Sequence, residues 1–182
     1  FSHGSHEEHK ERMDIVKKVR EDLGQPVAIL LDTKGPEIRT GNFAEPEVLL
    51  EEGQKFTITM KDVVGSKEIC TVSYKGLAKD VVPGVKINLP ALTEKDISDI
   101  EFGISQGIDF IAASFVRKAS DVLAIREVLE NNNATHIQII SKIENQEGID
   151  NIDSILEVSD GIMVARGDLG VEIPTPEIPI MI

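Results

Sequence analysis

The chain has 182 residues, a net charge of −13, 41% hydrophobic residues and only 4% aromatic ones. This aliphatic composition is typical of a buried parallel sheet and excludes a disordered chain. The negative charge argues against nucleic acid and anionic membranes as partners, because both polyanions repel such a surface. No stretch approaches the roughly 18 apolar residues that a membrane-spanning helix needs. The single cysteine, Cys70, is expected to be a small strand residue and favours a cytoplasmic location, where thiols stay reduced.

Four short apolar runs are predicted as buried strands, and amphipathic segments predicted as helices lie between them. The runs cover residues 27–31, 110–113, 137–140 and 161–164. Helix starts are expected at Ser5, Thr93, Ser120 and Asn145, and Ser5 with Glu8 has the spacing of a capping box. The strand starts at 110, 137 and 161 are 27 and 24 residues apart, which is the repeat of a (β/α) barrel or a doubly wound sheet.

The segment between the first two predicted strands is too long for one helix and its loops. From residue 43 to about residue 86 the pattern changes to short β-rich pieces, at 55–60 and 69–72, separated by glycines. We therefore expect a barrel domain at 1–41 and 86–182, with a small inserted β domain at 42–85. Three or four βα units cannot close an eight-stranded barrel, so the prediction is a partial barrel in an incomplete chain.

Charged residues follow two neighbouring predicted strands. Lys142 and Glu144 alternate along one strand and therefore share a face, and Asp168 follows the next strand. A salt bridge at a strand end is one interpretation of the Lys142–Glu144 pair. The other is a site in which Glu144 and Asp168 bind Mg²⁺ and Lys142 faces charge that develops on a substrate.

Two further segments carry groups suited to ligands. Gly167 could let backbone N–H groups approach an anion, although a simple turn between strand and helix explains it equally well. Residues 31–41 combine acidic, hydroxyl and cationic side chains around a Gly-Pro turn. Asp32 and Thr33 offer hard oxygen ligands there, and Arg39 suits phosphate, but a turn-capping Asp32 and a solvated Arg39 remain the ordinary alternatives.

Five motifs, taken together, closely resemble pyruvate kinase. They are FSHG at 1–4, LDTKGPEIRTG at 31–41, ASFVR at 113–117, SKIEN at 141–145 and the run at 163–174. The resemblance implies transfer of a phosphoryl group from phosphoenolpyruvate to ADP, giving pyruvate and ATP in glycolysis, with Mg²⁺ and K⁺ as cofactors. It also implies an active site at the carboxyl-end face of a (β/α)₈ TIM barrel, a mobile β-barrel lid at 42–85 and a homotetrameric parent protein.

The resemblance assigns roles to the residues around the predicted strand ends. Lys142 matches the catalytic lysine that stabilises the transferring phosphoryl group and the enolate oxygen, and it contacts substrate. Glu144 and Asp168 match the Mg²⁺ ligands, and the backbone of Gly167 and Asp168 matches the part that holds the substrate carboxylate. Ser114 and Phe115 would line the pocket floor.

The resemblance also assigns a second cation and the nucleotide. Ser2, Asp32 and Thr33 match K⁺ ligands. Arg39 matches a contact to the nucleotide phosphates, and His3 lies where the family also meets ATP.

The chain departs from the family pattern in three places. It begins after an expected arginine and asparagine, and it ends before the last barrel strands and the C-terminal domain. At Val81–Val82 the lid sequence jumps from its first half to its exit, so about forty residues are expected to be absent. Two rival interpretations remain: a Mg²⁺-dependent aldolase or lyase acting on a pyruvate enolate, which needs no nucleotide lid, and a non-catalytic fragment of the kinase.

Overall fold

The computed structural model describes residue 1 and residues 3–81 and 89–174. The chain divides into two compact units. The first unit consists of Phe1–Pro36 and Pro90–Ile182, and the second unit consists of Glu37–Leu89. The sequence analysis placed the insert at 42–85.

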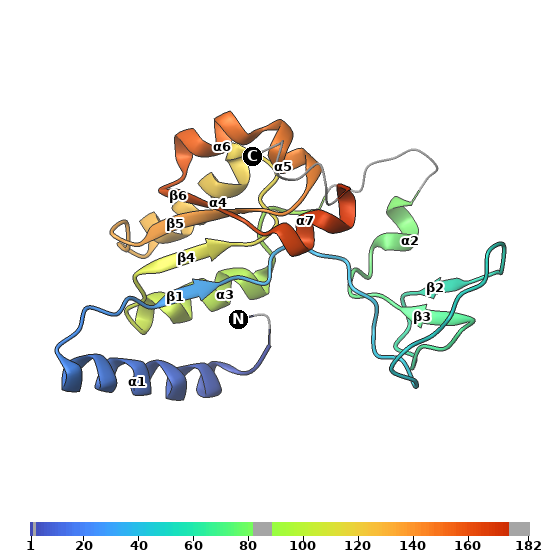
Figure 1. Cartoon of the computed structure of the whole chain (residues 1–182), viewed down its shortest axis with the longest axis horizontal. Coiled ribbons are helices and arrows are strands. Elements are labelled where there is room, and N and C mark those ends of the chain that lie inside the picture. Colours follow the sequence, from blue (N-terminus) through green and yellow to red (C-terminus); the bar gives the residue numbers. More distant parts are fainter. Residues whose placement is uncertain (2, 82–88, 175–182) are drawn as a thin grey trace. The chain divides into compact units, whose positions relative to one another are not determined.

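The first unit is built on one parallel sheet (Figure 1). Its strand order is β1-β4-β5-β6, so each strand after β1 adds beside the preceding one along the chain. The strands are β1 (Leu30–Asp32), β4 (Phe110–Ala113), β5 (Gln138–Ile143) and β6 (Gly161–Val164). The predicted strands at 110–113 and 161–164 are confirmed with the same bounds.

The other two strands differ from the prediction at their ends. Residues 27–29 do not pair as a strand; the N–H of Ile29 instead donates to the side chain of Asp109, 2.7 Å away, and Val27 is 48% exposed. The third predicted strand continues past residue 140 to Ile143, so Lys142 lies within β5. Apolar sequence marks where a strand can form, but backbone partners decide where it does.

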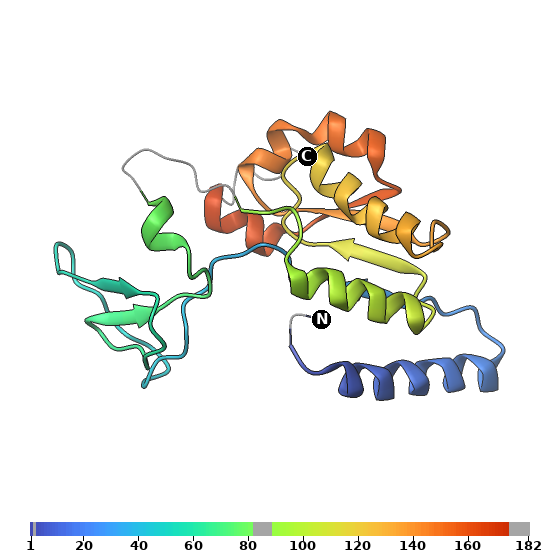
Figure 2. The same ribbon diagram turned by 180° about the vertical axis from the view of Figure 1, so that it is seen from behind.

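Helices α3 (Glu94–Ser105) and α4 (Ala119–Asn131) cover one face of this sheet, as Figure 2 shows from behind. The other helices of the first unit are α1 (His6–Leu23), α5 (Gln146–Asp150), α6 (Ile152–Val158) and α7 (Arg166–Glu172). The buried core between the layers is aliphatic and includes Leu31, Ile100, Ile111, Leu129, Ile139 and Ile143. Burying each such side chain stabilises the fold by roughly 1.5–3 kcal/mol.

Local capping chemistry sets the starts of α1, α3 and α5. Ser5 and Thr93 both form complete capping boxes, and the side chain of Asn145 accepts the N–H of Gly148. These three predicted starts are confirmed, because each cap satisfies backbone N–H groups that a helix leaves unpaired at its first turn.

Two helix predictions were wrong in detail. The helix expected after Ser120 is α4, which begins at Ala119 with Lys118 as its N-cap and has no side-chain capping hydrogen bond. The carboxylate of Asp121 instead accepts the N–H of Arg117, just before the helix. The fourth predicted helix is two helices, α5 and α6. They separate at Asn151, whose φ of −108° and ψ of 15° leave the helical region.

The second unit contains short β segments, as its sequence predicts. Strands β2 (Thr57–Thr59) and β3 (Ile69–Thr71) pair in parallel, and α2 (Leu77–Asp80) follows them. Both strands lie within the predicted β-rich pieces at 55–60 and 69–72. Cys70 is buried in β3, as expected of a small strand residue.

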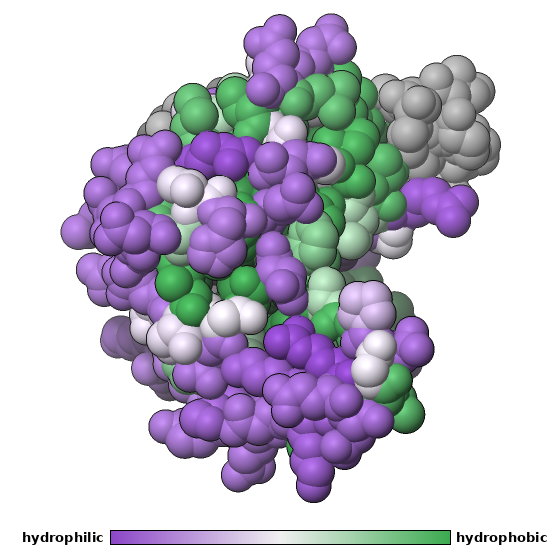
Figure 3. Space-filling model, turned by 90° about the vertical axis from the view of Figure 1, so that its left-hand side faces the viewer, coloured by the Kyte–Doolittle hydropathy of each residue, from purple (hydrophilic) through white to green (hydrophobic). Residues whose placement is uncertain are grey.

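Several aliphatic side chains stay at the surface of the first unit. Ile162 and Met163 of β6 are partly exposed, and β1 and β6 each have one open edge in the described sheet. Figure 3 shows hydrophobic areas between hydrophilic side chains on one side of the molecule. No helix within the described residues is both long and apolar enough to cross a membrane.

Asp160 ties the amino end of β6 to its neighbours, and its loss is expected to weaken the sheet. Its carboxylate accepts the N–H of Ile139 at 2.8 Å and pairs with Arg126 at 2.9 Å. Burial alone would raise the pKa of Asp160, but these two donors outweigh it and the pKa is lowered. We expect Asp160→Asn to reduce the free energy of unfolding by about 1–2 kcal/mol at pH 7, measured by urea denaturation.

The pH dependence follows from the lowered pKa. The carboxylate stabilises the fold above its unfolded pKa, and this contribution is lost as the pH falls through the folded value. The difference between wild type and Asp160→Asn should therefore shrink in acid. Asp153→Asn, at an exposed position of α6, is the control; an equal effect of both changes would contradict the prediction.

Candidate active site

Polar side chains from the carboxyl ends of β1, β4 and β5 converge on one ammonium group. Lys142 Nζ lies 3.2 Å from Asp32 Oδ1, 3.1 Å from Ser114 Oγ and 3.0 Å from Glu144 Oε1. The parallel register explains the meeting, because Asp32 stands beside Ala112 and Ala113 stands beside Ser141. Carboxyl ends of neighbouring parallel strands lie at the same edge of a sheet, where α/β proteins hold their ligands.

The Lys142–Glu144 pair is largely removed from water. The side chain of Lys142 is 13% exposed and that of Glu144 is 1% exposed. Burial lowers the pKa of Lys142, but the hydrogen bond and charge of Glu144, together with Asp32, outweigh it and raise the pKa. Lys142 therefore stays an ammonium ion. The predicted salt bridge between Lys142 and Glu144 is present at the strand ends, and the second interpretation, a Mg²⁺ site that faces a substrate, stays a prediction.

Glu144 is held from two sides. Its Oε1 faces Lys142, and its Oε2 accepts the N–H of Phe115 at 2.7 Å. Burial raises the pKa of Glu144; the Phe115 N–H and Lys142 oppose this, and the negative charge of Asp168 adds to it, so the pKa is raised overall. A further cation beside Glu144 would offset both the free-energy cost of burying its negative charge and the repulsion from Asp168.

Asp168 and Gly167 lie at the start of α7, just past β6. Both residues are exposed, and a Cβ built on Gly167 would have no neighbour within 4 Å. The charge of Asp168 acts on Glu144, so the two predicted Mg²⁺ ligands are electrostatically coupled. The turn that sequence analysis offered for Gly167 is the first turn of a helix.

The donor set fits a magnesium ion that is shared with a substrate. Within the described residues, no three His, Cys, Asp or Glu side chains gather as a complete metal cage. Mg²⁺ does not need one, because it commonly takes one or two carboxylates and completes its octahedron with water and substrate oxygens. Glu144 and Asp168 can supply those two carboxylates.

The loop after β1 brings Asp32 and Thr33 against Ser114. Thr33 Oγ1 accepts the N–H of Ser114 at 3.0 Å and lies 3.4 Å from the carbonyl of Ala112. Its hydroxyl is therefore committed to the fold. The carbonyl oxygen of Thr33 and the carboxylate of Asp32 are the remaining hard oxygens, and they fit a monovalent cation. Ser2, the third predicted K⁺ ligand, lies outside the described residues.

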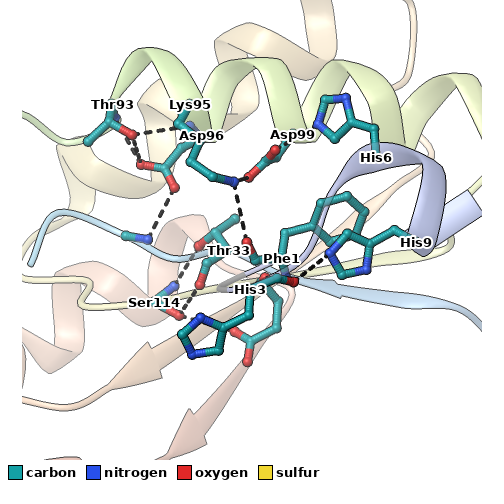
Figure 4. A network of polar contacts seen from close by, with 12 residues as sticks. Phe1, His3, His6, His9, Thr33, Thr93, Lys95, Asp96, Asp99 and Ser114 are labelled. Carbon is teal, nitrogen blue, oxygen red and sulfur yellow. Dashed lines mark hydrogen bonds and ion pairs between the residues drawn. The ribbon is translucent and has the colours of Figure 1, made fainter. Parts of the chain in front are cut away.

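Asp96 fixes the same loop from α3. Its carboxylate completes the capping box with Thr93 and also accepts the N–H of Gly35 at 3.1 Å (Figure 4). Gly35 has a φ of 72°, and a Cβ there would approach the carbonyl oxygen of Ser114 to 2.8 Å. Only glycine fits this position without strain. Sequence analysis placed a helix start at Thr93 but did not predict the contact of Asp96 with Gly35, 61 positions earlier in the sequence.

The two predicted nucleotide contacts lie in different units. His3 is exposed in the first unit, and its carbonyl accepts a hydrogen bond from the His9 ring at 2.9 Å (Figure 4). Arg39 belongs to the second unit, where its guanidinium pairs with Glu37 and its N–H donates to Ser73 Oγ at 2.9 Å. In the first unit, Lys142 therefore contacts Glu144 and Asp32, and Ser114 links them to Thr33. Arg39 has its contacts in the second unit.

Ser114 and Phe115 have a larger part in the site than sequence analysis gave them. The motif comparison assigned both to the pocket floor, whereas each donates or accepts a hydrogen bond to a predicted site residue. One signal was available: both directly follow β4, at the level where Asp32 ends β1 and Glu144 follows β5.

Comparison with known proteins agrees with this geometry. The family model described as pyruvate kinase, barrel domain, matches residues 1–87 and 81–182. The chain belongs to the pyruvate kinase family. Pyruvate kinases of Geobacillus stearothermophilus and Clostridium acetobutylicum are each 50% identical to it, over 225 and 224 aligned positions that cover 100% of this chain. The enzyme of Sporosarcina psychrophila is 48% identical over 225 positions. The predicted fold, an α/β barrel domain with a parallel sheet, is confirmed.

The chain spans 38% of the Geobacillus relative and 47% of the Clostridium relative. An alignment of 225 positions with a chain of 182 residues leaves at least 43 positions of the Geobacillus pyruvate kinase without a counterpart. The two segments matched by the pyruvate kinase model overlap at residues 81–87. The absence of residues at Val81–Val82 stays a prediction, and Val82 lies outside the described residues.

Proposed function

We propose that this chain carries the phosphoryl-transfer site of a pyruvate kinase, which converts phosphoenolpyruvate and ADP to pyruvate and ATP in glycolysis. One observation carries the proposal: Lys142 Nζ is held within 3.2 Å of Asp32, Ser114 and Glu144, at the ends of three adjacent strands. Family membership supports the choice of reaction, because its named relatives are pyruvate kinases.

In the proposed reaction the bond from phosphorus to the enol oxygen breaks and a bond to the terminal phosphate oxygen of ADP forms. Negative charge then spreads over the phosphoryl oxygens and the enolate, which takes up a proton to become pyruvate. Lys142 would neutralise that charge, and the backbone of Gly167 and Asp168 would hold the substrate carboxylate. Glu144 and Asp168 would hold Mg²⁺, which would supply Lewis-acid neutralisation.

The remaining ligand assignments are proposals for the same reaction. Asp32 and Thr33, with Ser2, would hold K⁺, and Arg39 and His3 would contact the nucleotide. The second unit would serve as the lid. We also propose a cytoplasmic location, because the chain has a single cysteine. The resemblance to pyruvate kinases supports the proposal that the parent protein is a homotetramer.

The test is an assay of a full-length kinase that carries these residues. Pyruvate formation is measured with phosphoenolpyruvate and ADP in the presence of Mg²⁺ and K⁺, and again with each component left out. We expect pyruvate in step with ATP and a loss of the reaction when ADP or Mg²⁺ is omitted. Pyruvate release from an aldol substrate without ADP would favour the lyase, and no reaction under any condition would favour a non-catalytic protein.

A further inference from the structure

Ser114 occupies the centre of the proposed site, between the loop after β1 and the ion pair at the end of β5. Its Oγ lies 2.6 Å from the carbonyl oxygen of Thr33, 3.1 Å from Asp32 Oδ1 and 3.1 Å from Lys142 Nζ. The residue is buried. A buried hydroxyl with three polar neighbours has a fixed orientation, because each alternative leaves a neighbour unsatisfied.

The donors and acceptors can be counted. An ammonium group has three N–H donors, and Lys142 has three acceptors in reach, Asp32, Ser114 and Glu144. Ser114 has one hydroxyl proton, and its short distance to the Thr33 carbonyl identifies that carbonyl as the acceptor. Its lone pairs are therefore turned toward Lys142, and the direction of the ammonium group is set by all three acceptors.

The three acceptors differ in what else they are expected to bind. Asp32 and Glu144 are proposed cation ligands, so their oxygens would be shared with K⁺ and Mg²⁺. The hydroxyl of Ser114 is not itself a proposed cation ligand. It donates to the carbonyl of Thr33, a proposed K⁺ ligand, and its hydrogen bonds reach neither proposed Mg²⁺ ligand, Glu144 or Asp168.

The backbone around Ser114 is itself fixed. The N–H of Ser114 donates to Thr33 Oγ1, and the N–H of Phe115 donates to Glu144 Oε2 at 2.7 Å. Phe115 has a φ of 55°, a left-handed conformation that costs a non-glycine residue of order 1 kcal/mol or more. In this conformation the turn directs the hydroxyl of Ser114 at Lys142 and the N–H of Phe115 at Glu144.

We propose that Ser114 is a positioning residue, whose hydroxyl directs the ammonium group of Lys142 independently of bound Mg²⁺. This inference rests on the proposed function, because it gives Ser114 a role in the same phosphoryl transfer. It separates Ser114 from the Mg²⁺ ligands: its loss should change turnover while leaving Mg²⁺ activation unchanged.

The first test is Ser114→Ala in the full-length kinase. A hydrogen bond to a charged group accounts for about a 10- to 100-fold change, so kcat should fall by that factor while the KM for phosphoenolpyruvate changes less than about threefold. The concentration of Mg²⁺ that gives half-maximal activity should match the wild type. A shift in it would mean that Ser114 acts through the Mg²⁺ ligands, and that result would overturn the inference.

The matched control is Ser141→Ala. Ser141 is also a buried serine, one residue before Lys142, but its hydroxyl pairs with Ser159 Oγ at 2.6 Å and does not reach the site. It should lower the melting temperature to a similar extent and leave kcat within about twofold of wild type. Equal kcat losses in the two variants would show a general packing effect and contradict the inference.

Ser114→Cys provides a second variant that keeps the size of the side chain and therefore the fold. A thiol is a weak acceptor for an ammonium group, so kcat should fall as in Ser114→Ala; wild-type kcat would overturn the inference. The two levels of the hypothesis fail differently. A wild-type enzyme that forms no pyruvate from phosphoenolpyruvate and ADP contradicts the proposed function, whereas an active wild type with an equally active Ser114→Cys contradicts only the role of Ser114.

Discussion

Replacing Lys142 with methionine is expected to lower kcat about 10³-fold or more and to change the KM for phosphoenolpyruvate less than about threefold. Methionine fills a similar volume but has no charge. The wild-type ammonium is 13% exposed and its raised pKa keeps it charged, so it acts in surroundings where a charge interacts strongly. Its contribution should be largest where negative charge develops, which is the transition state rather than the bound substrate.

Lys95→Met is the matched control for this change. Lys95 also pairs with a buried carboxylate, Asp99, but its side chain is 52% exposed on α3 and donates to the carbonyl of Phe1 rather than to the partners of Lys142. It should lower the melting temperature while leaving kcat within about threefold of wild type. Steady-state kinetics and thermal unfolding of both variants separate the two effects. Wild-type turnover in Lys142→Met would refute the assigned role of that residue.

The features that sequence analysis predicted correctly depend on short-range chemistry. The strands at 110–113 and 161–164 are short aliphatic runs between polar boundaries. Ser5 and Thr93 cap helices through residues only three positions away. The Lys142–Glu144 pair follows from the alternation of side chains along a strand. In each case the interaction partners are neighbours in the sequence.

The errors arise where a second segment decides the outcome. Residues 27–29 are as apolar as the strand that follows, but the side chain of Asp109 takes the N–H of Ile29. The helical pattern runs without interruption through Asn151, yet Asn151 side-chain contacts to Glu147 and Arg117 carbonyls accompany a break there. Periodicity reports which residues are apolar and not which backbone groups find a partner.

The site shows the same division. The motifs named Lys142, Glu144, Asp32 and Thr33 individually, and the structure brings them together. The hydrogen bonds of Ser114 join residues 28 and 82 positions away, and these depend on the register of β1, β4 and β5. No local pattern encodes that register, because each strand would be equally apolar if shifted by two residues. The roles of Ser2 and Arg39 stay predictions.

Replacing Glu144 with glutamine is expected to raise the Mg²⁺ concentration for half-maximal activity at least about tenfold and to lower kcat about 100-fold or more. The amide oxygen can still accept one of the two hydrogen bonds, from Lys142 or from Phe115, so the site keeps its shape. The charge that attracts a divalent cation is lost. The same substitution also leaves Lys142 with Asp32 as its only anionic partner within the described residues around it.

Stability provides an independent measurement of the same side chain. Burial raises the pKa of Glu144 above the ordinary glutamate value of 4.5, so the folded protein holds its proton more tightly than the unfolded chain does. The wild type should therefore lose stability relative to Glu144→Gln as the pH rises from below 4.5 through the folded pKa, in the absence of Mg²⁺. Glu147→Gln, the same change at an exposed position of α5, should alter neither metal activation nor this pH dependence. Unchanged Mg²⁺ activation in Glu144→Gln would contradict its role as a metal ligand, even if turnover fell, because the loss would then act through Lys142 alone.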